Sequence, residues 1–145
     1  MNGDGFLQLP DGSVRWGRFG AAGVLLRHRD RYFVAQRSMH SHQGGTWAVP
    51  GGALNSDEEP IVGALREFAE EIGVPLGDYE IALVYEDDHG GWSYWTIVLD
   101  VPAMFDLPER LHWETAACAW VTVEELHALE LFPAFRATLG NLGVL

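Results

Sequence analysis

The chain has 145 residues, of which 48% are hydrophobic and 21% charged, a composition that fits one globular domain over residues 1–145 and excludes a disordered chain. No apolar run approaches the ~20 residues that a membrane span needs, and the first residues lack a basic segment followed by an apolar one, so we expect neither a membrane anchor nor a secretion signal. The net charge of −12 argues against a polynucleotide or an anionic membrane as partner, and the single cysteine, Cys118, excludes an internal disulfide and fits a reducing cytoplasm.

The first fifty residues predict strands separated by polar turns. Residues 1–17 contain the turn signal Asp11-Gly12 and predict either a hairpin or an irregular arm. Apolar runs at 20–26 and 32–36 then predict two strands joined by a polar turn. A polar loop follows at 38–45, and residues 47–50 predict a short strand that Gly51-Gly52 ends.

The remaining sequence interleaves helices with an antiparallel pair of strands. The strongest helix prediction covers residues 60–72, because Pro60 stands at its first position and Gly73 follows its last turn. Strands are predicted at 79–85, 92–101 and 118–121, followed by a short helix that the capping-box pattern 122–125 opens and by a last helix at 133–139. This order predicts an α/β (α+β) fold, with a mixed sheet and helices packed on its faces.

The helix at 60–72 has one acidic face. At about 100° per residue, Glu67, Glu70 and Glu71 share one side, whereas the large apolar residues share another and explain why the helix docks. Like charges three and four residues apart destabilise a helix by a few tenths of a kcal/mol per pair. The face is either a solvated acidic surface or a site for a hard divalent cation such as Mg²⁺, which prefers oxygen ligands.

The sequence around this helix resembles a known motif. Gly52, five residues, Glu58, seven residues and then Arg66-Glu67-Phe68-Ala69-Glu70-Glu71-Ile72-Gly73-Val74 is similar to the Nudix box, G-x5-E-x7-R-E-U-x-E-E-x-G-U, with Phe68 as a mild departure. The resemblance implies a Nudix-type α/β/α sandwich. It also implies a Mg²⁺-dependent hydrolase, in which Mn²⁺ can substitute, that cleaves a phosphoanhydride bond of a nucleoside di- or triphosphate or another nucleoside diphosphate derivative. It allows a homodimer.

The resemblance also implies a role for each matched residue. Glu67, Glu70 and Glu71 resemble the metal-binding glutamates of the family, and the carbonyl of Gly51 resembles the backbone ligand. Arg66 and Glu58 resemble the pair that orients those carboxylates. Without the box, Arg66 would be interpreted as an ordinary surface residue in an ion pair.

Two flanking residues are further candidates. Arg37 resembles an arginine that contacts substrate phosphate in the mutator-type members, and otherwise it is a surface arginine at a strand end. Glu114 resembles a loop glutamate that binds metal or acts as the base in the same members, and otherwise it is a solvated loop acid. Either Glu67 or Glu114 is the candidate general base.

The substrate and the catalytic competence are less sharply predicted. The markers of the ADP-ribose and diadenosine polyphosphate subfamilies are not met, and Phe132-Pro133 is not followed by the asparagine with which the mutator-type enzyme reads oxidised guanine. Aromatic residues that could stack on a base are Trp16, Phe19, Trp92, Tyr94 and Trp95. The alternative function is a non-catalytic module of the same fold that senses a nucleotide, and the three intact glutamates argue against it.

Overall fold

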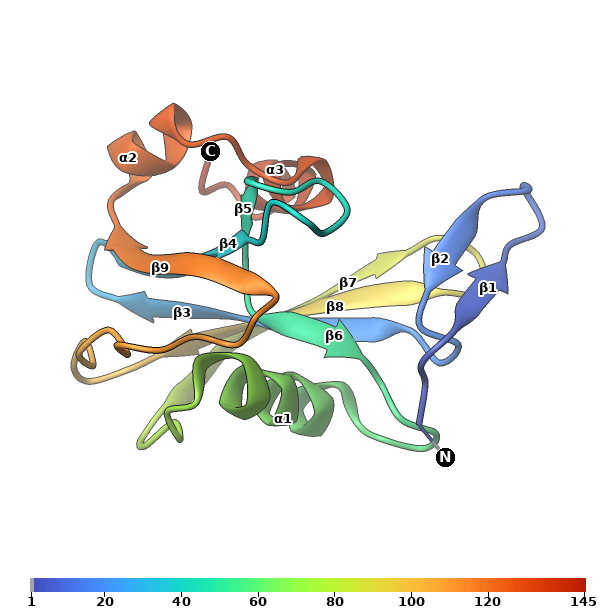
Figure 1. Cartoon of the computed structure of the whole chain (residues 1–145), viewed down its shortest axis with the longest axis horizontal. Coiled ribbons are helices and arrows are strands. Elements are labelled where there is room, and N and C mark those ends of the chain that lie inside the picture. Colours follow the sequence, from blue (N-terminus) through green and yellow to red (C-terminus); the bar gives the residue numbers. More distant parts are fainter. Residues whose placement is uncertain (1) are drawn as a thin grey trace.

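The computed structural model describes residues 2–145, which form three layers around a mixed sheet (Figure 1). The helices are α1 (Pro60–Ile72), α2 (Val123–Ala128) and α3 (Pro133–Asn141). The strands are β1 (Phe6–Gln8), β2 (Val14–Trp16), β3 (Ala21–His28), β4 (Arg31–Arg37), β5 (Trp47–Ala48), β6 (Gly51–Ala53), β7 (Glu80–Asp88), β8 (Ser93–Asp100) and β9 (Thr115–Val121). In Figure 1, α1 lies on one face of the sheet, and α2 and α3 lie on the other.

The central sheet combines parallel and antiparallel pairing. Its main path runs β5-β4-β3-β8-β7, with β6 paired to β3 and β9 paired to β4. The strands β3 and β8 are parallel, and the other pairs of this sheet are antiparallel. The predicted α+β class with a mixed sheet is therefore confirmed.

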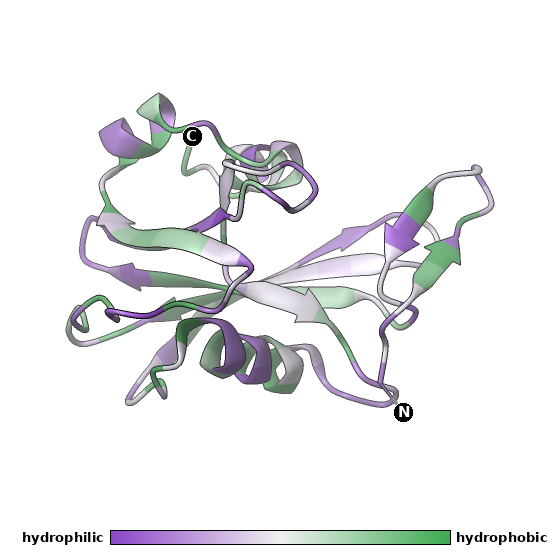
Figure 2. Ribbon diagram, in the orientation of Figure 1, coloured by the Kyte–Doolittle hydropathy of each residue, from purple (hydrophilic) through white to green (hydrophobic). Residues whose placement is uncertain are grey.

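Two apolar cores hold the layers together, one on each face of the sheet. Alternate residues of β3 point to opposite faces, as the period of a strand requires, so Val24 packs toward α1 and Leu25 toward α3. On the α1 side, Phe68 and Ile72 are fully buried, and on the other side Leu139 of α3 is fully buried. Figure 2 shows the corresponding alternation of hydrophobic and hydrophilic residues along α1.

Most predicted elements are observed. The helix at 60–72 has the predicted bounds, and Gly73 ends it in the left-handed conformation at φ 75°. Thr122 and Glu125 form both halves of the predicted capping box at the start of α2. In the described part of residues 1–17, β1 and β2 pair as an antiparallel hairpin, so the first of the two alternatives is observed. Among residues 2–145 no helix is long and apolar enough to cross a membrane.

Three strand predictions are wrong in their bounds. The predicted strand at 79–85 continues to Asp88, because β7 pairs with β8 as far as Ser93. The predicted strand at 47–50 is only the two-residue β5, and Gly51 and Gly52, predicted to end it, belong to β6, which pairs with Ala22 and Gly23 of β3. A pairing partner almost thirty residues away leaves no local signal, so a double glycine is interpreted as a turn. Strand β9 starts at Thr115, three residues before the predicted Cys118, because its pairing with β4 continues past a register shift at Arg37.

Candidate functional site

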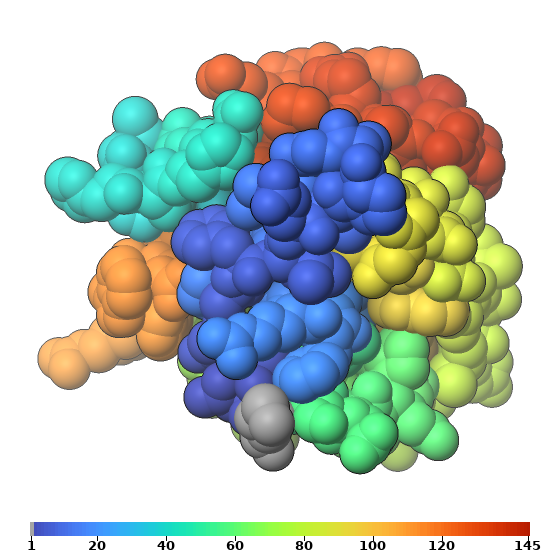
Figure 3. All heavy atoms as spheres, turned by 90° about the vertical axis from the view of Figure 1, so that its right-hand side faces the viewer, coloured from blue at the N-terminus to red at the C-terminus, as the bar shows by residue number. Residues whose placement is uncertain are grey.

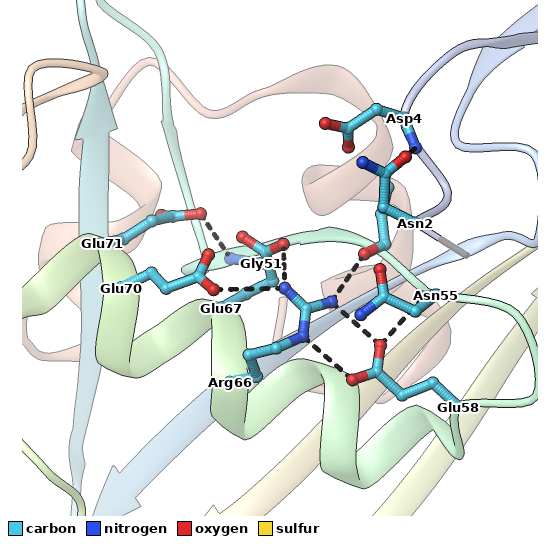
Figure 4. A network of polar contacts seen from close by, with 10 residues as sticks. Asn2, Asp4, Gly51, Asn55, Glu58, Arg66, Glu67, Glu70 and Glu71 are labelled. Carbon is cyan, nitrogen blue, oxygen red and sulfur yellow. Dashed lines mark hydrogen bonds and ion pairs between the residues drawn. The ribbon is translucent and has the colours of Figure 1, made fainter.

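The three glutamates of α1 project toward β6. Figure 4 shows Glu67, Glu70 and Glu71 on the same side of the helix, facing the backbone at Gly51. The amide of Gly51 donates a hydrogen bond to Oε1 of Glu71 over 3.3 Å. The shared acidic face that the helical period predicts is therefore present, and it faces the sheet edge instead of open solvent alone.

Arg66 organises one half of this face. Its guanidinium donates to both oxygens of Glu58 at 2.9 Å, to the carbonyl of Ala53 at 3.0 Å and to Oε1 of Glu67 at 2.9 Å. A longer contact of 3.4 Å reaches Oε1 of Glu70. The bonds to Arg66 lower the pKa of Glu58, and the bonds to Glu58 in turn raise the pKa of Arg66. The predicted pair thus ties α1 to β6 and fixes Glu67, the geometry that an orienting role requires.

Gly52 makes room for the Glu67 carboxyl group. A Cβ atom at position 52 would lie 2.5 Å from the carboxyl carbon of Glu67, so a side chain there would force the Glu67 carboxyl group to move. The glycine of the motif therefore lets the Glu67 carboxyl group lie directly against the backbone of β6.

Arg37 and Glu114, predicted from separate parts of the chain, meet Glu71 at one pocket. This pocket has a volume of about 80 Å³, and its lining includes Arg37, Gly51, Glu71 and Glu114. The amide of Ser38 donates to the carbonyl of Glu114 over 2.8 Å, which fixes the two loops against each other. In Figure 3 the loop 38–46 (cyan) and the segment that leads into β9 (orange) project from the same side of the molecule.

The guanidinium of Arg37 has no carboxylate partner among residues 2–145. Its Nε donates to the carbonyl of His42 over 2.8 Å, and its Cζ lies 5.0 Å from the ring centroid of Phe132. A guanidinium stacked on an aromatic ring in this way keeps its remaining N–H donors for another group. Phe132, singled out in the sequence only through the Phe-Pro pair, is thus the support of the predicted phosphate contact.

Glu71 lies in a very different electrostatic setting from Glu58. Burial is the main cause that raises the pKa of Glu71 to about 8, and the charges of Glu67 and Glu114 add to it. Burial also raises the pKa of Glu67, against the hydrogen bond from Arg66. Desolvation and like charge together make the ionised forms costly, so this end of the face favours a proton or a cation.

The donor set fits a hard cation. The contacts from Gly51 and Arg66 engage Oε1 of Glu71, Glu67 and Glu70 and leave Oε2 of each free of these bonds. Within residues 2–145 no three acidic, histidine or cysteine side chains converge on one point in this conformation. The three carboxylates would therefore have to turn toward one another to hold a cation. Glu70, the most exposed of the three, makes only a 3.4 Å contact with Arg66.

The predicted aromatic residues separate into three places. Trp16 packs on Phe6 in the β1–β2 hairpin. Phe19, Trp92 and Trp95 line a second, open hollow next to the β7–β8 turn. Tyr94 lies with its hydroxyl next to the backbone of Gly51, where a Cβ atom on that glycine would be 2.9 Å from it. Tyr94 is thus the aromatic candidate nearest to the acidic face.

Comparisons with known proteins agree with this geometry. A sequence model described as the NUDIX domain matches residues 17–140. A Mycobacterium tuberculosis protein that carries the name of an 8-oxo-dGTP diphosphatase is 38% identical over 97% of this chain and 69% of its own length. A "Nucleoside triphosphate pyrophosphatase/Nudix hydrolase fusion protein" of Bifidobacterium longum is 34% identical over 97% of this chain, which covers 32% of that protein. The crystal structure of the Nudix hydrolase RenU from M. smegmatis superposes with a TM-score of 0.85 at 34% identity, over 97% of this chain and 92% of that one.

Proposed function

The chain belongs to the Nudix hydrolase family and is a Nudix pyrophosphohydrolase, and from this premise we propose that it is a Mg²⁺-dependent enzyme that cleaves a phosphoanhydride bond of a nucleoside triphosphate. One observation carries the proposal: Arg37, Glu71 and Glu114, from three separate segments, line one pocket beside Gly51. The Mycobacterium tuberculosis relative is named for the hydrolysis of a nucleoside triphosphate, which favours that class over nucleotide sugars and dinucleotides.

Each proposed site residue has its own role in the reaction. Oxygens of Glu67, Glu70 and Glu71, with the carbonyl of Gly51, would hold the cation, which when bound neutralises phosphate charge and lowers the pKa of a bound water. Arg37 would hold a phosphate group through its free N–H donors. The base is either Glu67 or Glu114, and Arg66 would fix Glu67 in place.

We do not propose oxidised guanine as the preferred nucleobase of the substrate. The position that corresponds to the asparagine lies near Phe135, which is buried, or Arg136, which is exposed, and neither side chain offers the amide of the mutator-type enzyme. We therefore propose cleavage of ordinary nucleoside triphosphates, although relatives carry the name of 8-oxo-dGTP diphosphatases. The nucleotide substrate and the single cysteine also favour a cytoplasmic enzyme.

A release assay tests this proposal. Nucleoside triphosphates, including matched dGTP and 8-oxo-dGTP, a nucleotide sugar and a diadenosine polyphosphate are incubated with the protein and Mg²⁺, and the phosphate products are identified. We expect cleavage of triphosphates, its loss in EDTA, and its return with Mg²⁺ or Mn²⁺. Full turnover in EDTA would refute the role of the glutamates, and tight nucleotide binding without any cleavage would favour the sensor.

A further inference from the structure

The side chain of Tyr94 reaches from β8 across β3 to the backbone of β6. A Cβ atom on Gly23 of β3 would collide with the Tyr94 hydroxyl, and a Cβ atom on Gly51 of β6 would lie 2.9 Å from it. No other atom lies as close to the Gly23 position, so a side chain there would displace the hydroxyl. The tip of Tyr94 therefore lies against Gly51, the proposed backbone ligand of the cation.

The Tyr94 hydroxyl also borders the pocket at which Arg37 and Glu71 meet. A methyl group of Val49 would lie 2.7 Å from the same Cβ atom on Gly23, so the hydroxyl and Val49 lie side by side. Val49 and Gly51 both belong to the lining of the pocket. The hydroxyl therefore stands behind the wall that these two residues form.

This hydroxyl is not used within the chain. None of the side-chain hydrogen bonds found among residues 2–145 includes it, whereas the hydroxyl of Tyr85 accepts one from Asn141 over 2.9 Å. In the same part of the chain, the one enclosed side-chain nitrogen or oxygen without a partner is Nε of Arg15. The Tyr94 hydroxyl is thus unpaired but still accessible, so a ligand can accept its hydrogen bond.

The charges around Tyr94 are those of the site. Burial is the main cause that raises the pKa of Tyr94, the charge of Glu71 raises it further, and the smaller effects of Arg37 and Glu67 oppose each other. The phenol is therefore a neutral donor at neutral pH. It can hold an anionic oxygen next to the proposed cation without adding a charge of its own.

Tyr94 and Arg37 come to the site from opposite edges of β3. The stretch 21–23 of β3 pairs with β8 on one edge and with β6 on the other, and β4 lies on the side away from β8. Arg37 ends β4, and Tyr94 belongs to β8. A phosphate chain held by the Arg37 guanidinium next to Gly51 would therefore have the Tyr94 hydroxyl on its far side.

The next step deepens the proposed function and rests on it. We propose that the Tyr94 hydroxyl donates a hydrogen bond to a phosphate oxygen of the nucleotide substrate, on the side of Gly51 opposite Arg37. Tyr94 thus binds substrate through the tip of its side chain and not by stacking its ring on a nucleobase. The phosphate oxygen supplies the partner that the hydroxyl lacks within the chain, and the bond fixes the phosphate chain beside Gly51.

The binding of two anions to the full chain tests this assignment. A non-hydrolysable nucleoside triphosphate analogue and inorganic tripolyphosphate, which has no nucleoside, are titrated by calorimetry in the presence of Mg²⁺. Tyr94→Phe removes only the hydroxyl, so both Kd values should rise roughly 10-fold, the scale of one hydrogen bond to a charged group. Tyr85→Phe makes the same change where the hydroxyl already bonds to Asn141, and it should leave both Kd values unchanged.

Kinetics and melting curves separate this role from a structural one. In Tyr94→Phe, KM for the nucleotide should rise with little change in kcat, because the bond is made before and during the reaction alike. The Tm in EDTA should equal that of the wild type, since the hydroxyl has no partner in the folded chain. Unchanged Kd values, or weaker binding together with a lowered Tm, would overturn the inference.

Two further outcomes are distinct from these. Weaker binding of the nucleotide analogue with unchanged binding of tripolyphosphate would place the hydroxyl at the nucleoside and overturn the phosphate contact. If the wild-type chain neither binds nor cleaves a nucleotide, the proposed function itself fails. Cleavage by the wild type with wild-type binding in Tyr94→Phe would leave that function standing and remove only the role of Tyr94.

Discussion

The acidic region formed by the acidic face of α1 and the preceding Glu58 has two ends, which show how the same type of side chain can be placed for structure or for chemistry. At the Glu58 end, Arg66 satisfies the carboxylates internally, and the pKa of Glu58 is lowered. At the Glu71 end, the carboxylate has a backbone amide as its hydrogen-bond donor, and burial with the charges of Glu67 and Glu114 raises its pKa to about 8. The Glu58 end is stable without a bound cation, whereas the Glu71 end gains stability when a cation binds.

The largest effect is expected at the Glu71 end. Glu71→Gln keeps the size and the helix propensity but removes a proposed metal ligand, so turnover should fall by roughly 10³-fold or more. Glu124→Gln, on the exposed face of α2, is the control and should retain wild-type turnover. Steady-state rates with saturating Mg²⁺ measure this. Near-wild-type turnover in Glu71→Gln would mean that the Glu71 end is only a solvated surface.

At the Arg66 end we expect a loss of stability. Arg66→Ala would leave Glu58 and Glu67, with side chains only 11% and 17% exposed, without their cation, at a cost of about 3 kcal/mol of unfolding free energy. Arg31→Ala is the matched control, because that arginine is more exposed and its ion-pair distances are 4.0 Å and 3.8 Å, so about 0–1 kcal/mol is expected. Urea unfolding without metal compares the two. Equal small losses would show that Arg66 has no special structural role.

The sequence predicts the two ends of this face unequally. The helix from Pro60 to Ile72 and its acidic side follow from local signals, namely the proline, the glycine and the helical period. The Nudix box then identifies the pairing of Arg66 with Glu58, which seven intervening positions would otherwise hide. The family resemblance, not the helical period, makes that half predictable.

The other half depends on contacts between distant segments. The pairing of Gly51 with Gly23 and the stacking of Arg37 on Phe132 each join residues far apart in the chain. Such contacts become visible only once the sheet is assembled.

Arg37 tests whether the Glu71 end also holds substrate. Arg37→Ala should lower kcat/KM roughly 5- to 160-fold, which corresponds to about 1–3 kcal/mol, the scale of a charge-assisted hydrogen bond. The melting temperature should change little, since the side chain is tied only to the His42 carbonyl and the Phe132 ring. Arg37→Lys should recover part of the activity. An unchanged kcat/KM would make Arg37 an ordinary surface arginine at a strand end.

The smallest effect is the pH dependence of stability in EDTA. The pKa of Glu71 is about 8 in the folded chain and 4.5 as its unperturbed value, so the folded state holds this proton more tightly than the unfolded state. The resulting stabilisation is fully present below pH about 4.5 and is lost as the pH rises through about 8. Glutamine resembles the protonated carboxyl group and does not titrate. Glu71→Gln should therefore keep the stabilisation that the wild type loses as the pH rises.

Melting curves of the two proteins between pH 5 and 8.5 measure this difference. Without metal, the advantage of Glu71→Gln should grow across this range to roughly 1–2 kcal/mol, allowing for solvent at the open side of the pocket, or about 3–6 °C in Tm. With excess Mg²⁺ the order should reverse, because the cation stabilises the native wild type by RT ln(1 + [L]/Kd) and binds the variant more weakly. A difference in Tm that is constant with pH and insensitive to Mg²⁺ would mean that neither a proton nor a cation is held at Glu71. The two ends of the acidic face would then be electrostatically alike.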